Sequence, residues 1–114
     1  MVTILPLTPD ILIELCDKLG LTAEGLVWGY TASQGADLLG YCIVTEGDPC
    51  QILALHADDK YIADGLCRRA LHPFYEDGVK EYTFRQPPDL PMLPDYVIIG
   101  NGSLEKLFTP HCAS

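Results

Sequence analysis

The sequence predicts an α+β domain, α/β-like in part, in which a mixed but mostly antiparallel sheet is flanked by helices. Three observations predict this class: an amphipathic helical pattern over residues 9–19, alternating apolar strands over 26–57, and a strand–turn–helix–strand pattern over 52–84. The chain of 114 residues has room for one core, so residues 1–114 are expected to form a single domain.

The first helix is expected over residues 9–19. Thr8 suits the N-cap, Pro9 suits the first turn, and Gly20 is a typical helix stop. Apolar residues recur at helical spacing, with acidic and basic residues between them: Ile11, Leu12, Leu15 and Leu19. The pattern therefore predicts a helix with one face packed on the rest of the domain.

A meander of strands is expected next, because apolar runs are separated by turn residues at 33–37 and 46–49. Trp28 and Tyr30 would share one face of the first strand, and Tyr41 and Ile43 one face of the second. The expected strands are 26–31, 38–44 and 51–57.

The second helix is expected over residues 61–77, because Ile62, Leu66, Ala70 and Phe74 recur at intervals of four. Pro73 lies inside this pattern and removes a backbone donor, which predicts a kink or an early end near His72. Gly78 is the expected stop. A strand over 80–84, a proline-rich crossing segment over 85–95, a short strand over 96–99 and a helix over 104–108 capped by Asn101 or Ser103 complete the prediction.

Composition limits the classes of partner and the cellular compartment that we expect. The net charge of −9 argues against nucleic acid and anionic membranes and favours a basic partner. There is no long apolar run and no signal-peptide pattern, so a cytoplasmic protein is expected. Cys16, Cys42, Cys50, Cys67 and Cys112 have no paired spacing and are expected to be mostly core thiols, with Cys112 the most exposed. The histidines are not at metal-ligand spacing, so no metal site is expected.

The residues Lys60-Tyr61-Ile62-Ala63-Asp64-Gly65 follow the third strand and open the second helix. With the order of elements over residues 3–84, they make the chain resemble a short, degenerate member of the GCN5-related N-acetyltransferase superfamily, with a weaker echo over 96–108. In that family the turn carries an Arg/Gln-x-x-Gly-x-Gly/Ala motif, whose amides hold the pyrophosphate of acetyl-CoA. The resemblance thus implies a compact acyl-CoA N-acyltransferase-like fold and an acetyl-CoA site at Lys60, Tyr61, Ile62, Ala63, Asp64, Gly65 and Leu66.

The chain departs from the family pattern in ways that bear on chemistry. Ala63 stands where the family has a glycine, and Asp58, Asp59 and Asp64 place carboxylates around a diphosphate site. The stretch 101–108 resembles a family pattern whose tyrosine serves as general acid, but the matching residue is Phe108, which has no proton to donate. Arg68 and Arg69 could reach a phosphate from the helix, although a solvated face is the favoured interpretation.

Two functions remain open. The first is an acetyl-CoA-dependent N-acetyltransferase acting on a small amine or a basic peptide. No catalytic residue is assigned; a water-mediated base would be His56, placed half-buried in an alternating set with Ile52 and Ala54, or Glu46. The alternative is a non-catalytic binding or assembly module, whose exposed sheet edges could form a homodimer. An open V-shaped gap between strands 51–57 and 80–84 would indicate the enzyme, and a closed gap the module.

Overall fold

The structure is a computed structural model that describes residues 2–22, 25–47, 49–85 and 103–108. The expected proline-rich segment, except for Arg85, and the strand over 96–99 lie outside the described residues, as do Asn101 and Cys112. The mixed, mostly antiparallel sheet and the α+β class are confirmed.

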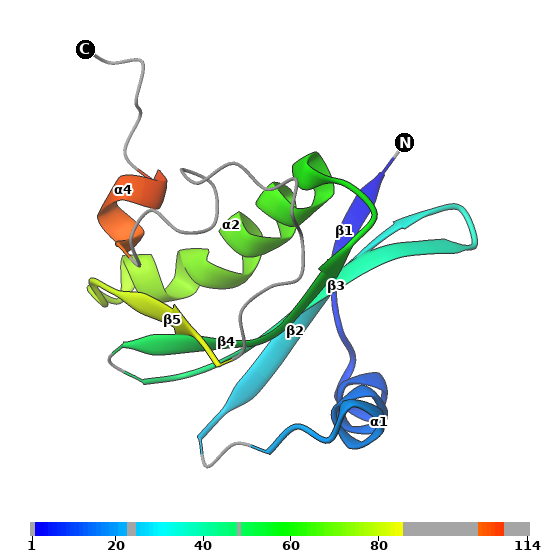
Figure 1. Ribbon diagram of the computed structural model, residues 1–114, viewed down its shortest axis with the longest axis horizontal. Helices are drawn as coiled ribbons and strands as arrows, with labels where there is room; N and C mark the ends of the chain where they lie inside the picture. The colour runs from blue at the N-terminus through cyan, green and yellow to red at the C-terminus, as the bar shows by residue number, and fades with distance from the viewer. Residues whose placement is uncertain (1, 23–24, 48, 86–102, 109–114) are drawn as a thin grey trace.

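One sheet of five strands organises the described residues, in the order β1-β2-β3-β4-β5 (Figure 1). Neighbouring strands are antiparallel except for β4 and β5, which are parallel. Figure 1 shows α2 across one face of the sheet and α1 on the other side. The strands are β1 (Thr3–Pro6), β2 (Val27–Gln34), β3 (Asp37–Thr45), β4 (Cys50–Ala57) and β5 (Tyr82–Phe84), and the helices are α1 (Pro9–Leu19), α2 (Lys60–Glu76) and α4 (Leu104–Phe108).

The core lies between α2 and the sheet face that it covers. From α2 it takes the apolar residues that the helical spacing predicts, including Ile62, Leu66, Ala70 and Phe74. Trp28 stacks on Phe74, with ring centroids 4.7 Å apart, and this contact joins the first long strand to the end of the helix. The sheet and α4 contribute Ala32, Cys42, Val44, Cys50, Ile52, Ala57, Tyr82 and Leu104.

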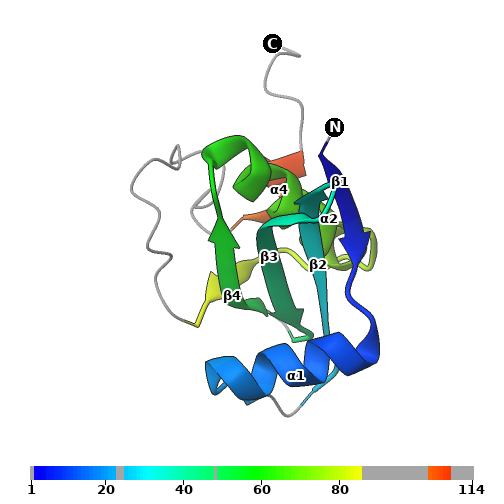
Figure 2. The same ribbon diagram turned by 90° about the vertical axis from the view of Figure 1, so that its right-hand side faces the viewer.

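Helix α1 has the predicted bounds but packs less tightly than its pattern suggests. It contains no buried residue, and Ile11, Ile13 and Leu19 are exposed. Figure 2 shows α1 at one end of the sheet, on the side away from α2. The prediction that Thr8 caps it with its side chain is wrong: Thr8 is the N-cap residue, but only its backbone carbonyl accepts, from Leu12. Gly20 ends the helix in the left-handed region, as predicted.

The predicted early end of α2 near His72 is wrong, because the helix continues through Pro73 to Glu76. The predicted stop at Gly78 is confirmed, because this glycine has a φ of +89° just after the helix. The N–H of Gly78 donates to the carbonyl of Tyr75, and the N–H of Val79 donates to the carbonyl of Phe74. These two bonds satisfy carbonyls of the last turn in a Schellman arrangement. The packing of Phe74 against Trp28 and the core offsets the donor that Pro73 lacks.

A β-bulge in β4 corrects the position predicted for His56. Ile43 pairs with Ala54 and Val44 with Ile52, so Leu53 is the extra residue. Beyond the bulge the faces exchange: Ile52 packs under α2, whereas Ala54 and His56 belong to the other face. His56 is therefore not in one alternating set with Ile52, and it is exposed rather than half-buried.

Two edge strands differ from the prediction. β1 has no counterpart in the sequence prediction, because Pro6 and Pro9 interrupt its apolar run; an edge strand tolerates such prolines. β5 is shorter than the predicted 80–84, since Glu81 forms an isolated bridge with Ser103 instead. Within the described part of the chain, β5 pairs with residues 50–52 of β4.

Candidate functional site

The N-terminus of α2 is the site that the resemblance singles out, and Asp59 occupies its N-cap. One carboxylate oxygen, Oδ1, accepts from the backbone N–H of Tyr61 and of Ile62, at 2.9 Å in each case. The N–H of Ala63 donates to the backbone carbonyl of Asp59 at 3.1 Å. The N–H groups of these three consecutive residues therefore have partners within the chain itself.

The residues assigned to acetyl-CoA by resemblance fall in different environments. Lys60 is the first residue of α2, Tyr61 is 76% exposed, and Ile62, Ala63 and Leu66 are buried against the sheet. Asp64 accepts from Nε of Arg68 at 2.8 Å. A Cβ placed on Gly65 would lie 3.0 Å from Ile4 Cδ1, so this glycine lets α2 approach β1 closely.

The electrostatics of this helix end favour the internal cap over an external anion. A phosphate that binds the N–H groups of Tyr61 and Ile62 would have to displace the Asp59 carboxylate or lie beside it. At about 4 Å, two like charges near a protein surface repel by a few kcal/mol. Asp58, which is exposed beside Asp59, adds a second carboxylate at the same helix end.

The second feature of the site is the edge of β4 that leads into α2. Arg85 N donates to Ile52 O at 3.0 Å, which closes the pairing of β4 with the β5 side. Within the described residues, β4 from Leu53 to Ala57 has no strand partner on this side. The V-shaped gap was predicted between strands 51–57 and 80–84. Both strands are described: they pair through residues 50–52 and 82–84, and β5 ends at Phe84, so the described part of β5 does not lie opposite Leu53–Ala57.

The two candidate bases lie far apart. His56 pairs with Tyr41 in the middle of β3, and the centroids of the two rings are 5.5 Å apart. Glu46 follows the other end of β3, where its Oε1 accepts from Leu26 N at 3.3 Å. Five residues of extended strand separate their positions, or about 16 Å. The structure therefore does not bring His56 and Glu46 together.

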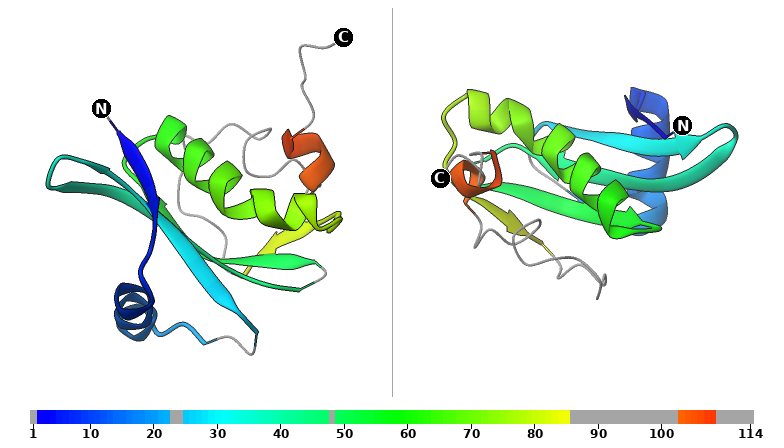
Figure 3. Two further views of the ribbon diagram at one scale, coloured as in Figure 1. Left: turned by 180° about the vertical axis from the view of Figure 1, so that it is seen from behind. Right: turned by 90° about the horizontal axis from the view of Figure 1, so that it is seen from above.

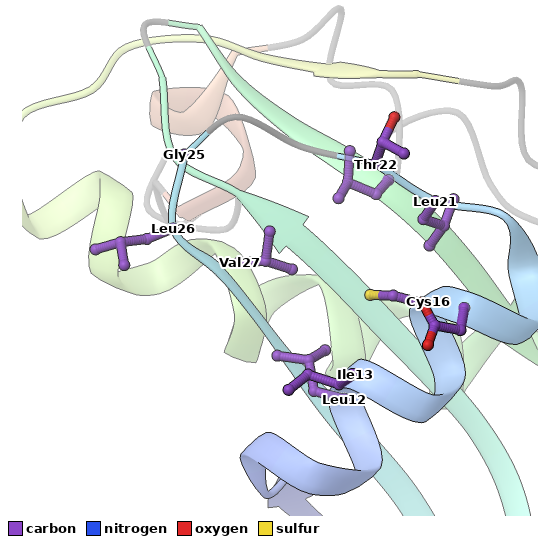
Figure 4. Close-up of a pocket in the computed structure, with 10 residues that line it drawn as sticks. Leu12, Ile13, Cys16, Leu21, Thr22, Gly25, Leu26 and Val27 are labelled. Carbon is purple, nitrogen blue, oxygen red and sulfur yellow. The ribbon is translucent and has the colours of Figure 1, made fainter.

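A cavity of about 390 Å³ lies between α1 and the sheet, and most of its lining is apolar (Figure 4). Figure 4 shows Leu12 and Cys16 of α1 across from Val27 at the start of β2. Burial is the larger cause that raises the pKa of the Cys16 thiol, and the nearby Asp17 charge is the second. A thiol with a raised pKa is a poor nucleophile, so Cys16 supplies no obvious chemistry here.

The other described cysteines are core residues, as predicted: Cys42, Cys50 and Cys67 are buried and unbridged. The hydrogen bond with Cys67 and burial raise the pKa of Cys42 well above its ordinary value. In the part of the chain that the structure describes, no group of three His, Cys, Asp or Glu side chains could hold a metal ion. None of the described helices is long and apolar enough to cross a membrane.

The second helix was expected to begin at residue 61, but no single residue was predicted to be its cap. The signal was present, because Asp59 directly precedes the helical pattern and Asp is a preferred N-cap. Comparisons with protein-family models, curated proteins and solved structures give no match to this chain.

Proposed function

We propose that this chain is a non-catalytic binding or assembly module, built on a compact fold like that of the GCN5-related N-acetyltransferases, that does not hold acetyl-CoA. The observation that carries the proposal is the Asp59 cap, because its Oδ1 accepts hydrogen bonds from the N–H groups of Tyr61 and Ile62. The family's cofactor site depends on just such amides at this helix end. Phe108, at the position of the family's acid, supports the same conclusion.

The partner of such a module is expected to be basic. The chain has 16 acidic and 7 basic residues, and a net charge of −9 steers cationic surfaces toward it. Association driven in this way weakens as salt rises, since exposed charges are screened within about 10 Å at 0.1 M ionic strength. A second copy of the chain is less favoured as the partner, because like net charges repel.

Thermal unfolding with millimolar acetyl-CoA at low salt tests the proposal. A ligand at 100 times its Kd would add about 2.7 kcal/mol, or several degrees in a domain of this size. We expect no rise in Tm for the native chain. The Asp59→Ser variant is the matched comparison, because it keeps a capping oxygen without the charge. A rise of several degrees in the native chain would overturn the proposal.

One observation favours the second candidate, an N-acetyltransferase acting on a small amine or a basic peptide. Among the residues that the structure describes, the edge of β4 from Leu53 to Ala57 has no strand partner beyond the parallel pairing that ends at Ile52, and this edge leads directly into α2. An edge of this kind could hold an extended ligand by main-chain hydrogen bonds. Release of CoA thiol from acetyl-CoA with spermidine or a lysine-rich peptide would support this candidate, and His56→Ala and Glu46→Ala would then identify the base.

A further inference from the structure

A second cavity, of about 460 Å³, lies along the middle of α2 and not at its N-terminus. It is bounded by β1 and β2 on one side and by α4 at the C-terminal end of α2; Figure 3 shows these elements around the helix. Its volume is within the range of small-molecule sites. The lining residues are Ile4, Tyr30, Gly65, Arg68, Arg69, His72, Pro73 and Phe108.

The lining of this cavity has a charge opposite to that of the whole chain. Two of the chain's 7 basic residues, Arg68 and Arg69, line it together with His72, and no Asp or Glu is among the described lining residues. The chain as a whole has 16 acidic residues and a net charge of −9. A cationic cavity in such a protein is a local exception, and it would attract an anion that the rest of the surface repels.

The two arginines are held in place by different contacts. Arg69 places its guanidinium carbon 5.8 Å from the centroid of the Tyr30 ring, a cation–π arrangement. Arg68 donates from Nε to Asp64 at 2.8 Å, and this ion pair neutralises much of its charge. Arg69 therefore carries most of the net positive charge of the cavity, about one unit, which matches a monoanion better than a dianion.

Apart from His72, the rest of the lining is apolar, and it is rich in rings. The His72 ring meets Phe108 edge-on, with centroids 5.4 Å apart and planes at 73°, while Nδ1 of His72 contacts Glu76 at 2.9 Å. Ile4, Tyr30 and Pro73 complete the apolar part, and Gly65 adds no side chain. Such a surface suits a flat apolar body that carries one charged group.

We infer that this cavity binds a small aromatic carboxylate. The carboxylate would pair with the guanidinium of Arg69, whose fork of N–H groups matches two carboxylate oxygens, and the ring of the ligand would pack against Tyr30 and Phe108. The inference goes beyond the proposed function, and it does not depend on whether acetyl-CoA binds at the Asp59 end of α2.

The test is a titration of the native chain with benzoate, followed by ¹H–¹⁵N NMR spectra at low salt. For a probe of this size we expect saturable binding with a Kd of about 1 mM, and shifts confined to the lining residues and their neighbours. Benzamide has the same shape without the charge and should bind at least about fivefold more weakly. Arg69→Gln should weaken benzoate by a similar factor, and Arg69→Lys by less.

The charge-matched control is Lys80→Gln, which removes a positive charge from an exposed residue that does not line this cavity. It should leave benzoate binding unchanged. Equal affinity for benzoate and benzamide, an equal effect of Arg69→Gln and Lys80→Gln, or shifts that cluster elsewhere would each overturn the inference. The comparison of benzoate with benzamide uses only the native chain, so it stands even if a variant folds poorly.

Discussion

The carboxylate of Asp59 accepts a hydrogen bond from the backbone N–H of Ile62, at 2.9 Å, and the Ile62 side chain is buried under the helix. One contact therefore satisfies a donor at the start of α2 while the same residue anchors that turn to the sheet. In the acetyltransferase family that the sequence resembles, the cofactor site needs these donors free. Here both N–H groups donate to Asp59, and this difference is the basis of the proposal that the chain does not bind the cofactor.

Replacing Asp59 by alanine should destabilise the domain by about 1 kcal/mol, because two N–H groups of the first turn lose their acceptor. The free energy of unfolding from urea denaturation measures this. Asp59→Asn should keep most of the stability. Asp58→Ala is the neighbouring control and should change it by less than about 0.5 kcal/mol, since the Asp58 side chain is exposed. An equal loss at both positions would contradict the role of Asp59 as the cap.

Replacing Pro73 by alanine should stabilise the domain by about 1–2 kcal/mol, because alanine restores a backbone donor inside α2 and favours the helix. The loss of proline's rigidity in the unfolded chain offsets part of the gain. Pro9→Ala is the matched control: Pro9 lies in the first turn of α1, where a missing donor has little effect, so a change under about 0.5 kcal/mol is expected. A destabilised Pro73→Ala variant would show that the proline ring itself is needed in the packing.

The amides of α1 should exchange with solvent faster than those of α2. Helix α1 contains no buried residue, whereas α2 buries Leu66, Leu71, Phe74 and their neighbours. Local opening of α1 should therefore need less free energy than opening of α2, which is expected only with global unfolding. Native-state hydrogen exchange measures both. Equal protection of the two helices would mean that something further covers the exposed face of α1.

Stability should fall in alkaline solution above about pH 9, because buried acids lose protons more readily once the chain unfolds. Burial, the largest cause, raises the pKa of Tyr82 above its ordinary 10.0. The hydrogen bond with Cys67, and then burial, raise the pKa of Cys42 above its ordinary 9.0. A group whose pKa is higher in the folded protein than in the unfolded chain contributes fully to stability at pH values below its unfolded-state pKa. This contribution is lost as the pH rises toward its folded-state pKa. Urea denaturation between pH 8 and about pH 11 should show this decline, and Tyr82→Phe should reduce it. A flat profile would contradict the raised pKa values of both groups.

Helices and central strands could be predicted because each has its own periodic pattern. The bounds of α1 match those expected, and α2 begins one residue earlier and ends one residue earlier than predicted. Tertiary packing decided the rest. Pro73 is tolerated inside α2, and β1 forms because β2 offers it a partner; neither effect is visible in the local sequence.

The position of the candidate site could be predicted from the sequence, but the contacts of its residues could not. The turn from β4 into α2 lies where the pattern placed it, and Asp59 is an ordinary N-cap signal. The bulge at Leu53 has no local signature, so the face of His56 was assigned wrongly. The cavity around Arg69 joins residues from β1, β2, α2 and α4, and only the packed structure brings these together.

The most direct test of the central claim is a titration of the native chain with acetyl-CoA, observed at the backbone amide signals of Tyr61 and Ile62 in ¹H–¹⁵N NMR spectra. Because Asp59 holds both N–H groups, we predict that neither signal moves as acetyl-CoA rises to millimolar concentration. Saturable shifts of both signals would contradict the account, since they would show the cofactor displacing the cap at the start of α2.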